Sequence, residues 1–558
     1  MRRTLRLLWI LALLFAAWTH DAYADKKTVC SITVNSSDEK EAFRRSLPPD
    51  KFQFVELVER GRPDWLASAC RQQIRCDVLV VSGHYDGYNE FYSDRLGVHE
   101  FLPVDELERA SCSNSCSGLF SQLKEVYLFG CNTLNPEALK RASSEIGRSL
   151  IRSGYSRSDA ERLSRSLSAR HGESSRDRVR LIFKNVPVIY GFSAKAPVGP
   201  AAASMLNGYF RSGGGGEIGG GRVSSGLRAH FANSSLAAAS GLSDSEPLAA
   251  LRRDVCQFSD DGLPAAQKLA FIHQLMGREM AEVRLYLDRI ERYMVSLGET
   301  ERGSPAVANA LEAIARDQDA RARYLAFTRD ADQPAVRARM IAVAGSLGWL
   351  SPAEKRAELV RMIGEQLARS TMNSADVDLV CALNKDHELD REFDRIQRSP
   401  VHASNVAHAA ALACLGNAEA REQVLLALTS PGDEGGQLAQ VYLRYRPITD
   451  VQELREITSG VARMNDPKAQ VRALDALASQ HLSDRESLEA LTRLFPVAES
   501  PGVQVAIAGI LIRSDSRAIA TPEVVQTLRQ SRLRSSSGKD LIDVLIRQLQ
   551  AQLDPPQL

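Results

Sequence analysis

The sequence predicts an α/β domain with a mostly parallel sheet and helices on both faces, followed by an all-α solenoid. Short continuous apolar runs such as Val78–Val81 stop at a serine or glycine, which is typical of strands buried on both faces of a parallel sheet. These runs alternate with helical patterns up to about residue 240, which favours helices covering both faces. From about Leu248 onward, strand signals vanish and helical spacing continues.

The N-terminus has the three-part layout of a secretory signal peptide. Three arginines precede an apolar run over Leu7–Trp18, and Ala22-Tyr23-Ala24 supplies small residues at a cleavage site. We therefore expect residues 1–24 to be removed and the protein to be exported, to the periplasm or outside the cell. An uncleaved anchor is the alternative, although the apolar run is short for a membrane span, and no later segment reaches the length a span requires.

Length and charge narrow the range of functions. A chain of 558 residues is too long for one ordinary core and suggests two or three domains. Its 70 lysines and arginines balance 69 acidic residues to a net charge of +1. No overall field favours nucleic acid or an anionic membrane as a partner.

The predicted α/β domain covers residues 25–240. Asp38 is expected to cap the first helix, and a further helix is expected around Val104–Ala110. The predicted strands are Thr28–Asn35, Phe52–Val58, Val78–Val81, Val126–Phe129 and Val186–Phe192.

A glycine-rich run, Gly213–Gly221, reads GGGGEIGGG and predicts a flexible loop or linker open to proteolytic nicking. It lacks the pattern of a phosphate-binding loop. Residues 241–330 are then predicted to form a helical linker region.

The last segment, residues 331–558, is predicted to form stacked helix pairs. Prolines at positions 334, 400, 467 and 501 differ by 66, 67 and 34 residues, close to multiples of about 33. Each proline suits the first turn of a helix and follows an Asp, Glu or Ser near the cap. A helical bundle without repeats is the alternative, because only some copies keep the full pattern.

Nine cysteines are an odd set for an exported protein. With Cys131 set aside as a free thiol, eight remain that could pair in an oxidising compartment. Cys112 and Cys116 are the best local candidates for a disulfide, whereas Cys381 and Cys414, in helical patterns, are expected to be small buried apolar residues. No second cysteine pair stands at ligand spacing, so neither a metal nor a cofactor is expected.

A histidine and a cysteine follow two predicted strands. His84 comes after Val78–Val81, and Cys131 comes after Val126–Phe129, so both are expected at one edge of the sheet. A thiol beside an imidazole is sufficient for nucleophilic catalysis, and the backbone N–H groups of Tyr85 and Cys131 are expected to receive an oxyanion. His99, His171 and His230 lack this context and are expected at the surface.

This arrangement resembles the caspase-like cysteine peptidases, which include caspases, metacaspases, gingipains, separases and proteins with CHAT domains. The likeness rests on Ser82-Gly83-His84 and on Cys131, 47 residues further on, and extends over about residues 28–232. It departs from caspases proper, which carry Gln-Ala-Cys-x-Gly where this chain has Gly130-Cys131-Asn132. It also has Tyr85 where much of the superfamily has glycine. The helical tail resembles HEAT repeats, which implies a protein partner.

The resemblance also implies where substrate binds. The strand Ile189–Ser193 and the apolar, proline-containing loop after it resemble the segment that lines the substrate groove in CHAT-type members. Several relatives prefer a basic residue before the cut, and Asp86, Glu90 and Asp94 are candidates to hold it. A solvated acidic loop is the alternative interpretation.

We therefore predict an exported caspase-like cysteine endopeptidase in which Cys131 attacks a protein or peptide substrate and His84 is the acid and base. A catalytically inactive binding scaffold with the same fold is the main alternative. A different thiol acyltransferase or hydrolase using the same two residues is another.

Overall fold

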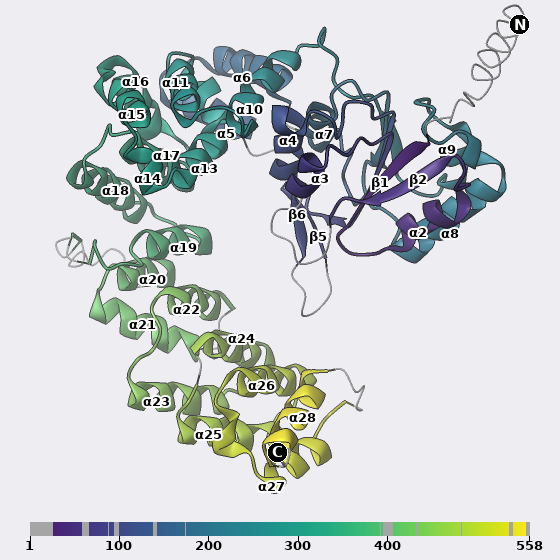
Figure 1. Cartoon of the computed structure of the whole chain (residues 1–558). Coiled ribbons are helices and arrows are strands. Elements are labelled where there is room, and N and C mark those ends of the chain that lie inside the picture. The colour runs from purple at the N-terminus through teal and green to yellow at the C-terminus, as the bar shows by residue number, and fades with distance from the viewer. Residues whose placement is uncertain are drawn as a thin grey trace, which may run out of the picture. The chain divides into compact units, whose positions relative to one another are not determined.

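The chain forms two compact units, Met1–Asp332 and Gln333–Leu558, seen in the computed structural model in Figure 1. The structure describes residues 26–58, 66–87, 89–93, 100–137, 142–172, 174–390, 392–393, 405–430, 433–480, 482–534 and 540–553. The predicted signal peptide, residues 1–24, lies outside the described residues, as do Asp94 and His99.

The first unit contains a six-stranded sheet in which five strands are parallel and the last is antiparallel. Its spatial order is β2 (Phe52–Glu56), β1 (Lys27–Thr33), β3 (Val78–Ser82), β7 (Glu125–Phe129), β8 (Val188–Phe192) and β9 (Leu236–Ala239). All residues of β3, β7 and β8 are buried, because helices cover both faces. The predicted fold class is confirmed, whereas β9 had not been predicted.

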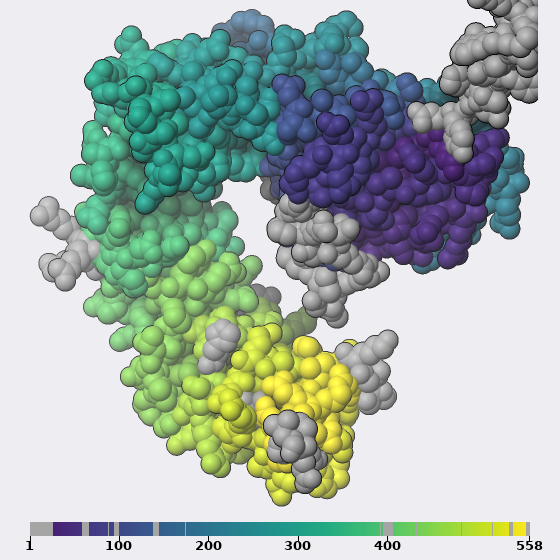
Figure 2. Space-filling view, in the orientation of Figure 1, coloured from purple at the N-terminus to yellow at the C-terminus, as the bar shows by residue number. Residues whose placement is uncertain are grey.

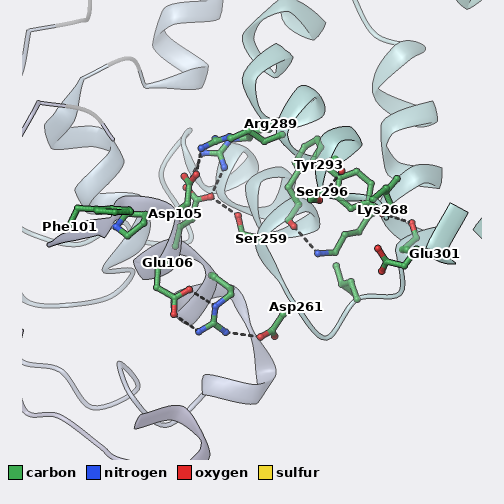
Figure 3. A pocket seen from close by; sticks show the side chains of 18 of the residues that line it. Phe101, Asp105, Glu106, Ser259, Asp261, Lys268, Arg289, Tyr293, Ser296 and Glu301 are labelled. Atoms are coloured by element: carbon green, nitrogen blue, oxygen red, sulfur yellow. Dashed lines mark hydrogen bonds and ion pairs between the residues drawn. The ribbon is translucent and has the colours of Figure 1, made fainter. Parts of the chain in front are cut away.

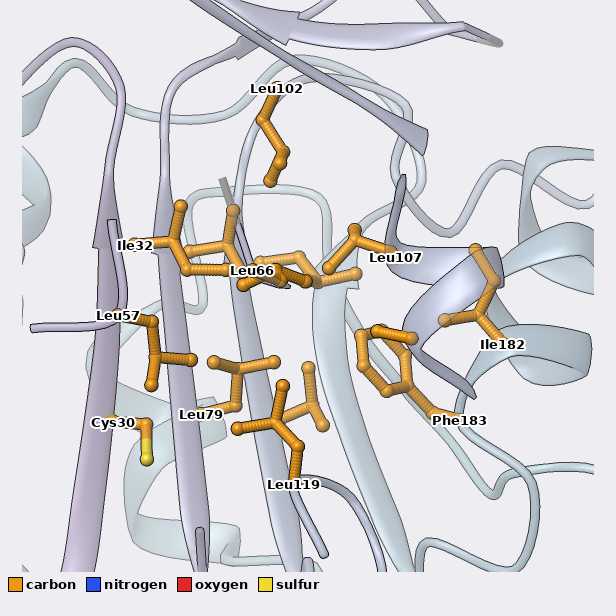
Figure 4. Packing of buried hydrophobic residues seen from close by; sticks show 14 of the residues in the cluster. Cys30, Ile32, Leu57, Leu66, Leu79, Leu102, Leu107, Leu119, Ile182 and Phe183 are labelled. Atoms are coloured by element: carbon orange, nitrogen blue, oxygen red, sulfur yellow. The ribbon is translucent and has the colours of Figure 1, made fainter. Parts of the chain in front are cut away.

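One face of the sheet packs against α2 (Asp38–Ser46), α8 (Gly199–Arg211) and α9 (Ser225–His230). The opposite face packs against α3 (Ala67–Arg71), α4 (Val104–Cys112) and α7 (Ser175–Ile182). Figure 4 shows this second core, where Leu79 of β3 lies among Leu107 of α4 and Phe183 just after α7. The two apolar layers fix the strands, so the ends of β3 and β7 are held in register.

A second, smaller sheet follows β3 directly. It is antiparallel and consists of β4 (His84–Tyr85), β5 (Glu90–Tyr92) and β6 (Phe101–Pro103). No strand was predicted here, because strands of two or three residues are too short to show alternation. His84 is therefore the first residue of a strand.

The glycine-rich run is folded, so the prediction of a flexible loop is wrong. The backbone N–H groups of Gly219 and Gly221 donate to the carboxylate of Glu125 at 2.9 and 3.0 Å, and that carboxylate is buried in β7. The side chain of Lys27 donates to the carbonyl of Ile218 at 2.8 Å. Gly219 and Gly221 have φ of 69° and 67°, a conformation that favours glycine. The glycines of this run therefore allow the backbone N–H groups to bind a carboxylate.

The rest of the first unit is helical. Its helices are α5 (Ala142–Arg152), α6 (Arg157–His171), α10 (Ala249–Ser259), α11 (Ala265–Met276), α12 (Met280–Leu285), α13 (Leu287–Ser296), α14 (Glu299–Arg302), α15 (Pro305–Arg316) and α16 (Gln318–Asp330). The carboxylate of Glu108 in α4 pairs with Arg289 of α13, and both side chains are largely buried. Figure 2 shows the helical region of residues 249–330 in direct contact with the α/β part of the same unit. Residues 241–330, predicted as a linker region, thus pack against α4.

The second unit consists of helices that pack in two alternating rows. They are α17 (Pro334–Ser346), α18 (Pro352–Leu367), α19 (Ser374–Leu383), α20 (Val406–Cys414), α21 (Ala418–Leu428), α22 (Asp433–Tyr445), α23 (Val451–Ala462), α24 (Pro467–Leu477), α25 (Arg485–Leu494), α26 (Pro501–Arg513), α27 (Pro522–Gln530) and α28 (Leu541–Leu553). Pro334, Pro467 and Pro501 begin helices, as predicted, whereas Pro400 lies outside the described residues. The pattern is consistent with the predicted solenoid.

Eight cysteines form four disulfides and Cys131 is free, as expected for an oxidising compartment. The predicted pair Cys112–Cys116 is wrong. Cys112 ends α4 and bonds to Cys256 of α10, while Cys116 bonds to Cys70 of α3. The prediction for Cys381 and Cys414 is also wrong, because α19 and α20 pack side by side and these two residues form a disulfide. The fourth disulfide joins Cys30 and Cys76.

Within the part of the chain that the structure describes, no helix combines the length and the apolar character needed to span a membrane.

The cysteine pairing predicts a single reactive thiol. Protein purified without reductant and then denatured should bind one equivalent of a thiol reagent, all of it on Cys131, since the other eight sulfurs are bonded. Peptide mapping by mass spectrometry should recover Cys112 linked to Cys256. A Cys112–Cys116 peptide, or more than one thiol per chain, would contradict the structure.

Candidate active site at the carboxyl edge of the sheet

His84 and Cys131 occupy equivalent positions beyond two hydrogen-bonded strands. Strands β3 and β7 are parallel neighbours, with Ser82 opposite Phe129, and each of the two candidate residues lies two positions further along. The sheet order places a topological switch point between β1 and β3, because β1 connects to β2 on one side and β3 connects to β7 on the other, and His84 follows β3. Ligands of open α/β sheets bind at such an edge, outside the carboxyl ends of the strands.

The segments that carry the two residues are in close contact through Gly130. A Cβ atom at Gly130 would lie 2.8 Å from the Cβ of Tyr85 and 3.0 Å from the carbonyl oxygen of Gly83. The N–H of Gly83 also donates to the carbonyl of Phe129 at 3.4 Å. Both residues that flank His84 therefore approach the residue that precedes Cys131, and only glycine fits between them.

Cys131 lies in a tight turn that is fixed from inside. The hydroxyl of Thr133, which is fully buried, donates to the carbonyl of Gly130 at 3.2 Å and accepts from the N–H of Phe192 at 3.0 Å. Asn132 adopts φ of 59°, in the left-handed region that asparagine tolerates better than most residues, and its N–H donates to Ala194 at 2.7 Å. These bonds attach the cysteine turn to the segment after β8.

The sulfur of Cys131 is half-buried and accepts a hydrogen bond. The backbone N–H of Ala196 lies 3.3 Å from Sγ and points at it. This hydrogen bond joins the free cysteine to the segment after β8.

Ser193, predicted to line the substrate pocket, supports the loop after β8. Its hydroxyl donates to the carbonyl of Ser235 at 3.3 Å, and its N–H donates to the same carbonyl at 3.0 Å. The hydroxyl of Ser235 in turn donates to the carbonyl of Lys195 at 2.9 Å. These bonds hold in place the segment that reaches the cysteine sulfur.

His84 is half-buried, and its ring lies beside Tyr92 of β5, with ring centroids 5.5 Å apart. The next residue, Tyr85, points to the other side of the small sheet and packs on Phe91 at 4.8 Å. The imidazole is thus placed by a cross-strand pair, which fixes its orientation relative to the sheet edge. The oxyanion role of the Tyr85 and Cys131 N–H groups stays a prediction.

The acidic residues near His84 differ in their roles. One carboxylate oxygen of Asp86 accepts from the N–H groups of Asn89 and Glu90 at 2.7 and 3.1 Å, so it closes the turn between β4 and β5. Glu90 is half-buried in β5, opposite Pro103. Asp94 lies outside the described residues. Asp86 therefore stabilises the turn between β4 and β5.

A carboxyl group that the sequence analysis missed lies beneath the same edge. Glu39, in the first turn of α2, is 3% exposed, and burial raises its pKa from 4.5 to about 7, while a backbone hydrogen bond of Glu39 itself opposes part of that shift. Ser82 is two residues before His84 and pairs with Thr33 of β1. Glu39 could not be singled out from the sequence, because it reads as an acidic residue in the first turn of a helix, a position that many exposed glutamates occupy.

Two histidines expected at the surface are packed instead. The His171 side chain is 8% exposed, lies 3.7 Å from Glu282 and contacts the ring of Tyr286. His230 packs on Tyr209 and bonds through Nδ1 to the carbonyl of Gly226 at 2.9 Å. Their helical context gave no sign of these contacts. No cluster of three or more potential metal ligands occurs in the described parts of the chain.

Comparison of this chain with family models, curated proteins and solved structures gave no match. The site therefore has to be interpreted from its own geometry.

Protonation of Glu39 predicts a pH-dependent stability. Because the folded chain binds this proton more tightly than the unfolded chain, the contribution is complete below pH 4.5 and is lost as the pH rises through 7. The difference in pKa corresponds to about 3 kcal/mol. Glu39→Gln should remove most of this dependence and unfold at a higher temperature than the wild type at pH 8.

Calorimetry between pH 5 and 8 measures this effect. Glu41→Gln, in the same helix but partly exposed, is the matched control and should keep the wild-type pH dependence. If Glu39→Gln and the wild type lost stability in parallel, the carboxyl would not be the titrating group.

Proposed function

We propose that this chain is an exported cysteine endopeptidase of the caspase-like type, with Cys131 as nucleophile and His84 as acid and base. The observation that carries the proposal is the contact of Gly130 with Tyr85 and Gly83, which brings the His84 and Cys131 segments together. The mostly parallel sheet and the helical tail are compatible with the resemblance to that superfamily.

The proposed reaction uses these groups in two stages. The Cys131 thiolate attacks the scissile carbonyl, a C–S bond forms, and the backbone N–H groups of Tyr85 and Cys131 stabilise the oxyanion. The His84 imidazolium gives its proton to the leaving amine as the C–N bond breaks, which leaves a thioester. Water then transfers a proton to His84 while it attacks the thioester, and the carboxylic acid leaves as the C–S bond breaks.

The compartment fits this chemistry. Four disulfides are compatible with an oxidising environment, to which the predicted signal peptide would direct the chain. In that environment Cys131 stays free because the other eight cysteines are paired with one another.

The helical repeats are proposed to bind a protein partner or to present substrate. Stacked helix pairs create extended surfaces suited to that task. Exposed apolar side chains occur there at Leu426 and Val497, which are 69% and 70% exposed. No site on the repeats is assigned.

Peptide turnover tests the assignment. Cys131→Ala should reduce cleavage of a peptide library to background, because no other thiol is free, and His84→Ala should reduce kcat/KM by about 10²–10⁴-fold. His387→Ala, an exposed histidine in the second unit, is the matched control and should keep wild-type activity.

Several outcomes would contradict the proposal. Full activity of Cys131→Ala would reject the nucleophile. Turnover of small esters but of no peptide would favour another thiol hydrolase. No turnover of either by the wild type would favour the binding scaffold.

A further inference from the structure

A large open cavity lies on the side of the small sheet that faces α10–α14. Its volume is about 1250 Å³, and it lies between β6 with α4 on one side and α10, α11, α13 and α14 on the other (Figure 3). Lining residues include Phe101, Asp105, Phe258, Leu263, Tyr293 and Glu301. The proposed reaction does not use any of them.

The cavity is acidic and has an aromatic lining. The cavity is lined by six carboxylates and four cationic side chains. Three of the cations are engaged by carboxylates of the cavity: Arg109 pairs with Glu106 and Asp261, Arg289 with Glu108, and Arg292 with Asp105. The ammonium group of the fourth, Lys268, donates to the carbonyl of Phe258 at 2.8 Å. Arg178, which does not line the cavity, pairs with Asp105 as well, so the six carboxylates exceed the cations beside them by one. Glu301 is exposed.

One ammonium group of the protein itself, that of Lys268, already lies beside an aromatic ring of the lining. The Nζ atom of Lys268 lies 5.8 Å from the ring centroid of Tyr293, and Figure 3 shows this side chain directed into the cavity toward Ser296 and Tyr293. Burial lowers the pKa of Lys268, although Asp260, Asp261 and Glu301 oppose that shift by favouring positive charge. Carboxylates and an aromatic face together form a setting for cations.

The cavity is connected to the candidate active site by one cross-strand row. Tyr92 is the register partner of His84 on one side and of Phe101 on the other. Directly paired residues of an antiparallel sheet point to the same face, so His84, Tyr92 and Phe101 form a continuous strip. Two strand spacings separate His84 from Phe101, about 10 Å, which an extended peptide covers in roughly three residues.

We propose that this cavity binds the basic segment of a polypeptide substrate, rich in lysine or arginine, while its scissile bond lies at Cys131. This rests on the proposed peptidase function. The strip of His84, Tyr92 and Phe101 supports the connecting residues, the carboxylates attract the basic side chains, and the aromatic rings contact their aliphatic stems. The basic residues then lie three or more positions from the bond that is cut.

Binding is measured first, without turnover. In the Cys131→Ala background, a fluorescein-labelled dodecapeptide of alternating lysine and alanine is titrated, and fluorescence anisotropy gives Kd. Glu301→Lys should weaken binding at least tenfold, and Phe101→Ala should weaken it by a smaller factor. Glu419→Lys, an exposed position in the second unit, makes the same change in net charge and should stay within twofold. Equal Kd values for Glu301→Lys and Glu419→Lys would overturn the proposal.

Turnover by chains with Cys131 intact separates this inference from the proposed function. If peptides are cleaved, Glu301→Lys should raise KM for substrates with distal lysines and leave KM for substrates without them unchanged. If peptides are cleaved but Glu301→Lys changes KM equally for both kinds of substrate, the cavity is rejected as a substrate site and the peptidase function is still supported. If the peptide binds in a way that depends on Glu301 but the chain cleaves no peptide, the cation site is supported and the peptidase function is rejected.

Discussion

The candidate site depends on one close approach between two backbone segments. A Cβ atom at Gly130 would lie 2.8 Å from the Cβ of Tyr85 and 3.0 Å from the carbonyl oxygen of Gly83, so the stretch after β3 and the stretch after β7 meet where a side chain would push them apart. The helix layers on both faces fix β3 and β7 in register, and the buried Thr133 hydroxyl fixes the turn. Cys131 follows Gly130, and His84 lies between Gly83 and Tyr85, so these contacts bring the backbones of the two residues close together. The N–H of Ala196, in the loop after β8, donates to the sulfur of Cys131.

The sequence predicted those parts of the fold in which the residues have to be apolar because they are buried. Val78–Val81 and Val126–Phe129 were recognisable as strands because both of their faces are covered, which demands unbroken apolar runs. The same logic located His84 and Cys131 at strand ends. Strand β9 was missed because Leu-Ala-Ala-Ala carries little strand preference, and its place is set by pairing with β8. The small sheet was missed because strands of two or three residues are too short to show a recognisable alternation.

Features that depend on contacts distant in sequence could not be predicted. Cys112 and Cys116 are close in the chain, yet their partners come from α10 and α3, because pairing follows the packing of helices rather than the spacing of cysteines. The glycine-rich run suggested flexibility, whereas its N–H groups bind the buried carboxylate of Glu125. Glu39 looked like an ordinary helix-start residue, and its raised pKa results from burial under the sheet edge. In each case the deciding partner lies many residues away.

The most direct test of the central claim is the alkylation rate of Cys131 by iodoacetamide at pH 6. If His84 and Cys131 meet through Gly130, a protonated imidazole stabilises the thiolate. The wild type should then react at least tenfold faster than His84→Ala or Gly130→Ala. Gly216→Ala, where an added Cβ meets nothing within 4 Å, should react like the wild type. Equal rates in the wild type, His84→Ala and Gly130→Ala would show that the two side chains do not act together, and the account would be wrong.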